Sequence, residues 1–262
     1  MVRFRYFILI VLACISFSPI FNRDSYAADV CIIDSYKIKI TQKIKDQLSM
    51  VLSQNGNVSY ANYGDTRQCR VKIILGTPGV VKELKKASPY EKVIYTFVMF
   101  PEVLGLDKKK NFYGVRIFPL PMRTINKFFS YTGMKKRKVA VIVSKMNEKI
   151  AKKYLPSHSF DILLINSRVE EAFPKLNKYK YIYIFPDPEV LKLVNVLSLV
   201  NYAKHTGKIL IAGLPDLDRY DINFIYAVDF PALTRELIKL TRENPKKHIL
   251  PCPAKVKVWV SR

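Results

Sequence analysis

Short apolar runs alternate with amphipathic segments along most of the chain. After most runs, apolar residues recur at three- and four-residue steps, which is the pattern of a helix that packs against a sheet. The expected strands are residues 30–33, 57–63, 70–75, 92–99, 114–118, 138–143, 161–165, 181–185, 208–212, 221–228 and 255–260. The expected helices are residues 37–54, 80–86, 122–133, 147–155, 168–176, 188–206 and 232–243. This alternation predicts an α/β fold with parallel sheets.

The clearest unit spans residues 181–216. An aromatic and β-branched strand ends at Pro186, and Pro188 and Glu189 suit the first turn of a helix. Gly207 would end that helix, and a second strand follows, parallel to the first. Asp187 stands just past the first strand, at the sheet edge where ligands bind in such folds. Asp187 is therefore either a ligand-binding residue or the N-cap of the helix.

A second strand-to-helix turn reads Gly76, Thr77, Pro78, Gly79. We expect the Thr77 hydroxyl to cap the helix and Pro78 to occupy its first position. Free amides at such a helix start suit a carboxylate or another anion, although the turn could also be capping alone.

Two such series of about 100 residues each meet at a proline-rich point near residues 119–121. They predict two Rossmann-like lobes with a ligand cleft between them. Lobe 1 would hold residues 28–118 and about 228–247, and lobe 2 residues 119–227 and about 248–262. In the helix at 37–54 the side chains expected to face the core are Ile38, Ile40, Ile44, Leu48 and Leu52.

The first 27 residues have the features of a signal peptide. Arg3 and Arg5 precede an apolar run, and Ser25-Tyr26-Ala27 predicts cleavage after Ala27. Two alternatives stay open: acylation of Cys14, which ends a loose lipobox, and an uncleaved membrane anchor.

The chain is strongly basic, with 44 Lys and Arg against 21 Asp and Glu. Without residues 1–27 the balance is 41 − 20 = +21, which attracts anions, anionic lipid surfaces or acidic partners. The clusters at Lys108–Lys110 and Lys135–Lys138 lie between expected elements, and we interpret them as solvated turns. The export signal and the lack of a binding motif argue against nucleic acid as a partner.

Motifs for chemistry are missing from the sequence. It has no glycine-rich nucleotide loop, no GxSxG elbow and no CxxC pair, and its three histidines are far apart. We therefore expect no enzyme activity, no cofactor and no metal site. Cys31 and Cys69 could form a disulfide if their strands are neighbours, or could stay as separate buried thiols.

In order and spacing, five stretches resemble the type I periplasmic substrate-binding proteins of ABC transporters, in the branch that includes aromatic amino-acid binders. These stretches are Gly76–Val80, Asn111–Val115, Tyr183–Pro188, Ala203–Ala212 and Val228–Phe230. The resemblance covers most of residues 30–250. It implies that the chain crosses between the lobes near residues 118, 228 and 247.

The same resemblance implies roles for individual residues. A ligand carboxylate would meet Thr77 and the helix start at Pro78, Gly79 and Val80, and a ligand amino group would meet Asp187. Phe100 stands where the family usually has an aspartate, and Ser144 ends another strand at the expected cleft. Aromatic side chains near that cleft could stack on an aromatic ligand or belong to the core: Tyr36, Phe97, Phe100 and Phe118.

These features predict a monomeric exported solute-binding protein that delivers a small, carboxylate-bearing or aromatic ligand to an ABC permease. The alternative is a degenerate module of the same fold that contacts a protein or an anionic membrane surface and has no transported ligand.

Overall fold

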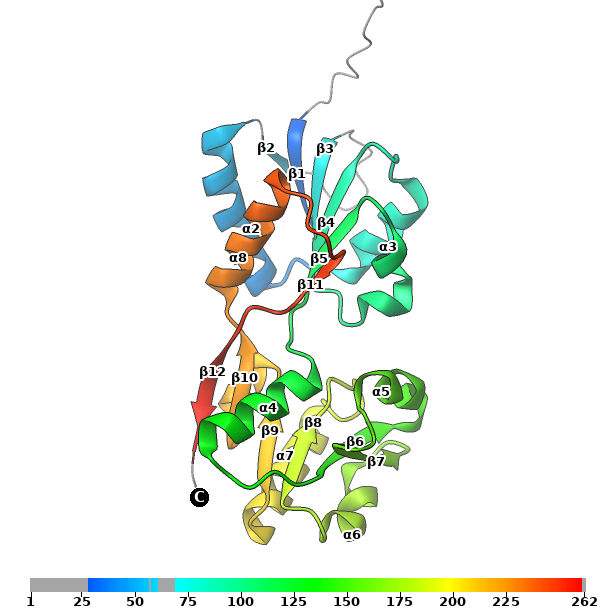
Figure 1. Cartoon of the computed structure of the whole chain (residues 1–262), viewed down its shortest axis with the longest axis vertical. Helices are drawn as coiled ribbons and strands as arrows, with labels where there is room; N and C mark the ends of the chain where they lie inside the picture. Colours follow the sequence, from blue (N-terminus) through cyan, green and yellow to red (C-terminus); the bar gives the residue numbers. More distant parts are fainter. Residues whose placement is uncertain (1–27, 57, 61–68, 261–262) are drawn as a thin grey trace, which may run out of the picture.

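The computed structural model describes residues 28–56, 58–60 and 69–260. Within them the chain forms two α/β lobes that follow one another along the long axis of the molecule (Figure 1). The predicted signal peptide, including Cys14, lies outside the described residues.

The sheet of lobe 1 has the order β11-β5-β4-β3-β1-β2, and every pair of neighbours is parallel. Its strands are β1 (Ala28–Asp34), β2 (Val58–Tyr60), β3 (Cys69–Leu75), β4 (Lys92–Thr96), β5 (Phe112–Val115) and β11 (Ile249–Leu250). One face packs against α2 (Lys39–Leu52) and α8 (Phe230–Arg242), and the 3-10 turn η1 (Ser53–Asn55) follows α2. The other face packs against α3 (Thr77–Lys86) and the 3-10 turns η2 (Pro101–Leu104) and η3 (Leu106–Lys108).

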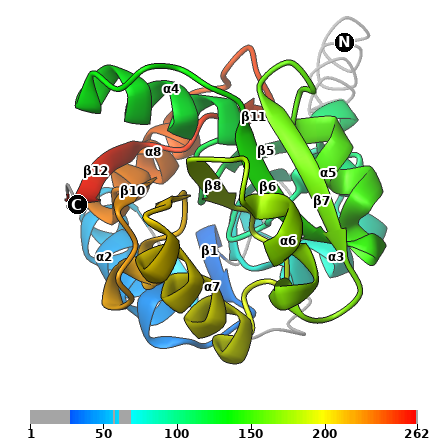
Figure 2. The same ribbon diagram turned by 90° about the horizontal axis from the view of Figure 1, so that it is seen from below.

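The sheet of lobe 2 has the order β12-β10-β9-β8-β6-β7. Its strands are β6 (Val139–Ser144), β7 (Phe160–Ile165), β8 (Tyr181–Ile184), β9 (Ile209–Ala212), β10 (Phe224–Val228) and β12 (Ala254–Trp259). One face packs against α4 (Pro121–Thr132) and α5 (Glu148–Tyr154). The other packs against α7 (Leu193–Thr206) and the short η5 (Val169–Ala172) and α6 (Phe173–Leu176). Seen from below, α6 and α7 lie on one side of the strands of lobe 2, and α4 and α5 lie on the other (Figure 2).

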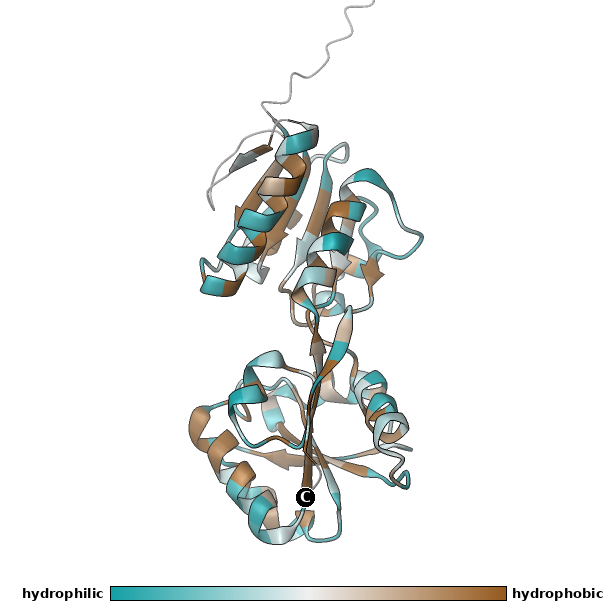
Figure 3. Cartoon of the chain, turned by 90° about the vertical axis from the view of Figure 1, so that its left-hand side faces the viewer, coloured by the Kyte–Doolittle hydropathy of each residue, from teal (hydrophilic) through white to brown (hydrophobic). Residues whose placement is uncertain are grey.

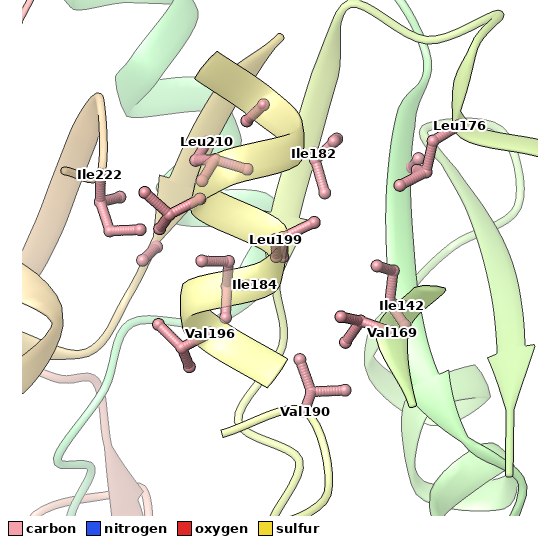
Figure 4. Close-up of a cluster of buried hydrophobic side chains, with 14 of the residues drawn as sticks. Ile142, Val169, Leu176, Ile182, Ile184, Val190, Val196, Leu199, Leu210 and Ile222 are labelled. Atoms are coloured by element: carbon pink, nitrogen blue, oxygen red, sulfur yellow. The ribbon is translucent and has the colours of Figure 1, made fainter. Parts of the chain in front are cut away.

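The core of each lobe comes from strands that are apolar on both faces. β6, β8, β9 and β10 are buried along their whole length, as expected for strands covered by helices on both sides. Figure 4 shows one side of this core, where Ile182, Ile184 and Leu210 of the sheet meet Val196 and Leu199 of α7. Hydrophobic colour follows the strands, and the helices show hydrophilic and hydrophobic colour together (Figure 3).

The βαβ unit predicted at residues 181–216 is confirmed, because β8 and β9 pair in parallel, with Ile182 opposite Leu210. The helix start is a correction: α7 begins at Leu193, not at Pro188, and Lys192 is its N-cap. The parallel arrangement also needs one correction, since β12 runs antiparallel to β10. Residues 251–253 connect β11 of lobe 1 directly to β12. The strand therefore begins at the cleft and runs away from it.

The strand β11 was not predicted, and it moves one expected boundary. Ile249 and Leu250 pair with Gly114 and Val115 of β5, so the chain stays with the sheet of lobe 1 beyond residue 247. Its return to the sheet of lobe 2 falls at residues 251–253. The other two passages lie between β5 and α4 and between β10 and α8.

The structure joins Cys31 and Cys69 in a disulfide. Their strands β1 and β3 are neighbours in the sheet, which is the condition that the sequence left open. Cys252 is a free, buried thiol, and burial raises its pKa to about 12. In the described part of the chain, no helix has the length and apolar character needed to cross a membrane.

Candidate functional site

A mainly apolar pocket of about 340 Å³ lies between the lobes, and we call it the interlobe pocket. Lobe 1 contributes Ile38, Ile40, Phe97, Met99 and Phe230, the passage after β5 contributes Ile117, and the last residue of β10 contributes Val228. Lobe 2 contributes Leu191, Val196, Leu214, Pro215, Asp216, Leu217, Arg219 and Tyr220. These residues follow β1, β4, β5, β8 or β9, end β10, or lie in the first turn of the next helix, so the pocket lies at the carboxyl ends of both sheets.

A buried aspartate at the end of β1 shapes the first wall. One oxygen of Asp34 accepts hydrogen bonds from the amides of Tyr36 (3.1 Å) and Lys37 (2.9 Å). Its other oxygen accepts the Thr41 hydroxyl at 2.8 Å. This turn places Ile38 at the N-cap of α2, where its side chain is 49% exposed. Ile38 therefore lines the pocket. Its helical spacing had predicted that it belongs to the buried core, and this prediction is wrong.

Phe97 forms the second wall in an unusual backbone conformation. Its φ of 59° is a left-handed value that costs a bulky residue free energy, so surrounding contacts must hold it. The Thr77 hydroxyl lies 3.5 Å from the Phe97 carbonyl oxygen and donates to it. The Phe97 ring stacks on Phe230, with centroids 6.5 Å apart and planes 7° apart. These two rings give the pocket an aromatic surface.

The third wall is the 3-10 turn η6 (Pro215–Arg219), which follows β9. It brings the charged groups of Asp216 and Arg219 to an otherwise apolar lining. The Arg219 guanidinium lies 5.2 Å from the centre of the Tyr220 ring, an arrangement that favours a cation–π contact. A ligand in this pocket would meet apolar groups over most of its surface and charges at one side.

The predicted anion site at the start of α3 looks different in detail. Gly76 is the N-cap, with φ of 118°, and the Thr77 hydroxyl caps no amide. Pro78 has no N–H, and the Val80 amide donates to the Gly76 carbonyl at 3.4 Å. In this first turn the amides of Thr77 and Gly79 are the ones left for an anion. Thr77 contributes to the interlobe pocket through Phe97, and Thr77 to Val80 are not among its lining residues.

Asp187 is fully buried and joins the ends of two strands. One oxygen accepts both the amide and the hydroxyl of Ser144, each at 2.8 Å. The other accepts the Glu189 amide at 2.8 Å. Asn147 donates to the Ser144 hydroxyl at 3.2 Å. The structure thus brings Asp187 and Ser144, two predicted ligand-binding residues, into contact. Neither residue lines the interlobe pocket. Asp187 is not a helix cap, because the N-cap of α7 is Lys192.

Phe100 fills a second interlobe region, which we call the interlobe clamp: Phe100, Glu102, Arg116, Phe118, Tyr154 and Phe185. The Phe100 ring of lobe 1 lies 5.3 Å from Tyr154 and 5.7 Å from Phe185, both of lobe 2. Glu102 pairs with Arg116 and accepts the Tyr154 hydroxyl at 2.6 Å. Burial raises the pKa of Tyr154, although Arg116 lowers it, so the hydroxyl stays a donor. The clamp joins the lobes without a ligand.

Replacing Tyr154 with phenylalanine keeps the ring and removes the hydrogen bond to Glu102. We expect a loss of about 1.5–3 kcal/mol in the contact between the lobes, because the lost bond was made to a charged group. Small-angle X-ray scattering should then show a larger radius of gyration. Tyr131, which is half exposed on α4, provides the matched control: Tyr131→Phe should leave the radius unchanged. An unchanged radius in Tyr154→Phe would show that the clamp does not set the lobe separation.

The sequence pointed to the right strand ends but missed most of the pocket. Phe97 was noted among the aromatic residues near the cleft. Ile40 was expected to face the core, Phe230 was noted only within the stretch Val228–Phe230, and the η6 turn was not singled out. The sequence did contain a signal for the η6 turn. Leu214 and Pro215 come shortly after a buried strand, and no long helix separates them from the next strand.

No protein-family model matches the sequence, and no curated protein matches it at a significant level. Solved structures do match the fold. One is a ligand-free, open structure of CD0873, a substrate-binding protein with adhesive properties from Clostridium difficile (TM-score 0.65, 14% identity, 87% of this chain and 90% of that chain).

Two further matches are ligand complexes. An ABC domain in complex with L-Trp from Streptococcus pneumonia has a TM-score of 0.52 and 11% identity, over 86% of this chain and 89% of that one. An ABC transporter solute-binding protein from Agrobacterium vitis, bound with alpha-D-tagatopyranose, has a TM-score of 0.50 and 10% identity, over 87% and 94%. Together with the two mostly parallel sheets, these matches show that the chain has the two-lobed periplasmic binding protein-like I fold.

Proposed function

We propose that this protein is an exported solute-binding protein of an ABC-type uptake system, and that its small ligand binds in the interlobe pocket. The observation that carries the proposal is the pocket itself. It combines side chains of both lobes at the carboxyl ends of their strands, where ligands bind in folds of this type. Two of the similar structures are a substrate-binding and a solute-binding protein, which supports the binding of a small ligand.

The lining favours a ligand with an apolar or aromatic body and a charged group. Phe97 and Phe230 would contact the body, while Arg219 would receive a carboxylate and Asp216 an amino group. An aromatic amino acid has all three features, and the structure complexed with L-Trp makes this class the first to test. Thr77, Gly79, Asp187 and Ser144 remain predicted ligand residues for a form in which the lobes approach one another further.

The delivery of the ligand to an ABC permease, export through residues 1–27 and a monomeric state belong to the same proposal. They rest on the sequence features and on the similarity in fold.

Ile38, which is the N-cap of α2, and Met50, which lies within α2, offer a test. Ile38→Asp places a carboxylate in the apolar pocket, so we expect ligand affinity to fall by at least about tenfold, because the bound ligand would desolvate an unpaired charge. Met50→Asp is the matched control, since Met50 is 66% exposed on the same helix and outside the pocket. The ligand would first be released from purified protein by mild denaturation and identified by mass spectrometry, and affinity measured by calorimetry.

Equal affinity in wild type and Ile38→Asp would contradict the placement of the ligand in the interlobe pocket. An empty protein, with no thermal shift on adding amino acids or other carboxylates, would contradict the receptor function itself.

A further inference from the structure

The second lobe carries a basic pocket at its far end, remote from the interlobe pocket. It has a volume of about 310 Å³ and lies between α4, the 133–138 loop and the start of β7. Lys136, Arg137 and His158 line it together with Asn126 of α4, and we call it the distal basic pocket. Strands β6 and β7 begin here and end at the cleft, so the two pockets lie at opposite ends of lobe 2.

The charge of this region is largely unpaired. Residues 123–153 hold ten Lys and Arg and one acidic residue, Glu148. Lys138 pairs with Asp161 at 2.9 Å, but no ion pair found among residues 28–56, 58–60 and 69–260 involves Lys136 or Arg137. Two neighbouring cations without partners, placed at the rim of a hollow, raise the local concentration of anions.

The pocket differs from a solvated lysine turn because it also has an apolar floor. Ile125 and Phe129, which are buried residues of α4, line it together with the half-buried Met122. The amide of Asn126 and the hydroxyl of Ser159 add neutral hydrogen-bonding groups. A ligand that satisfies this lining needs an anionic group for the rim and an apolar part for the floor.

We propose that the distal basic pocket binds an organic phosphate, with the phosphate on Lys136, Arg137 and His158 and the apolar part on Phe129. A phosphate monoester carries close to two negative charges at neutral pH and three acceptor oxygens, which the Arg fork and Lys ammonium match. A soluble organic phosphate can supply such a monoester, whereas the headgroup of an anionic phospholipid is a phosphodiester with one negative charge and two free oxygens. Both present anionic phosphate oxygens to the same cations. The inference is independent of the ligand of the interlobe pocket.

The test uses the full chain as wild type, as Lys136→Ala/Arg137→Ala and as Lys109→Ala/Lys110→Ala. The last variant removes the same charge from the exposed basic loop of lobe 1 and is the matched control. Binding of phenyl phosphate and of inorganic phosphate would be measured by calorimetry. Binding to phosphatidylglycerol vesicles would be measured by flotation, with phosphatidylcholine vesicles as reference. All proteins carry the same N-terminus, so its contribution to flotation cancels.

We expect wild type to bind phenyl phosphate more tightly than inorganic phosphate, and the 136/137 variant to lose about tenfold or more in affinity because two charged hydrogen-bond donors are gone. The control should keep wild-type affinity. If the 136/137 variant loses affinity only for phosphatidylglycerol vesicles, the pocket is supported and its phosphate comes from a lipid headgroup. No binding to any probe, or equal losses in both variants, would overturn the proposal and leave only the general attraction of a basic protein for anions.

Discussion

Replacing Cys31 and Cys69 together with alanine is expected to lower the free energy of unfolding by about 4 kcal/mol. The two residues are 38 apart in the sequence, and closing a loop of that length removes conformational freedom mainly from the unfolded chain. Both cysteines are fully buried, so the loss of packing adds to the effect. In thermal unfolding this corresponds to a decrease of about 10 °C for a protein of this size.

The free thiol provides the control for this experiment. Cys252→Ala removes a buried sulfur without removing a cross-link, so it reports the packing contribution alone. A reducing agent should bring the wild type close to the double variant and leave the difference between Cys252→Ala and wild type unchanged. If the double variant and Cys252→Ala lose similar amounts, the disulfide does not stabilise the fold.

The fold could be predicted from the sequence because its signals are local. Strands such as β6 and β8 are continuous apolar runs between turn residues, and α4 and α8 show apolar residues at helical spacing. The missed features depend on contacts far apart in the sequence. β11 has only two residues and exists because β5 lies beside it, and β12 is antiparallel because of the position at which the chain returns.

The candidate site was less predictable for the same reason. Asp187 and Thr77 occupy the strand ends at which a ligand was expected, but their partners, Ser144 and the Phe97 carbonyl, lie 43 and 20 residues away. Phe100 could be noted as a departure from the resembling family. Phe100 packs against Tyr154 and Phe185 of the other lobe, and this contact depends on the relative position of the two lobes, which the sequence does not reveal.

Lys72→Met is expected to destabilise the protein by about 3–5 kcal/mol at neutral pH, because it leaves two buried carboxylates without a cation. Lys72 lies on β3 and contacts Glu83 of α3 at 3.0 Å and Glu91 at 3.1 Å. All three residues are at most 7% exposed. Burial alone would lower the pKa of Lys72, but the hydrogen bonds to Glu83 and Glu91 outweigh it and raise that pKa. The lysine is thus held in its charged form and joins α3 to the strand.

Chemical denaturation at several pH values tests this role. In Lys72→Met, burial without a cation should raise the carboxylate pKa values above those of the unfolded chain. A raised carboxylate pKa contributes stability that is lost as pH rises through it, so the deficit of the variant should shrink toward pH 4 and grow toward pH 7.

The triple variant Lys72→Met/Glu83→Met/Glu91→Gln separates the charge effect from packing. It removes all three charges and keeps an acceptor for the Ser88 amide, which donates to Glu91 at 3.1 Å. Replacing a complete buried ion cluster by neutral groups of similar volume is often close to neutral, so this variant should recover most of the loss. A triple variant as unstable as Lys72→Met would instead assign the loss to the lysine side chain as a packing element. Recovery would show that Lys72 is required because Glu83 and Glu91 are charged, and that this face of lobe 1 depends on the balance of those charges.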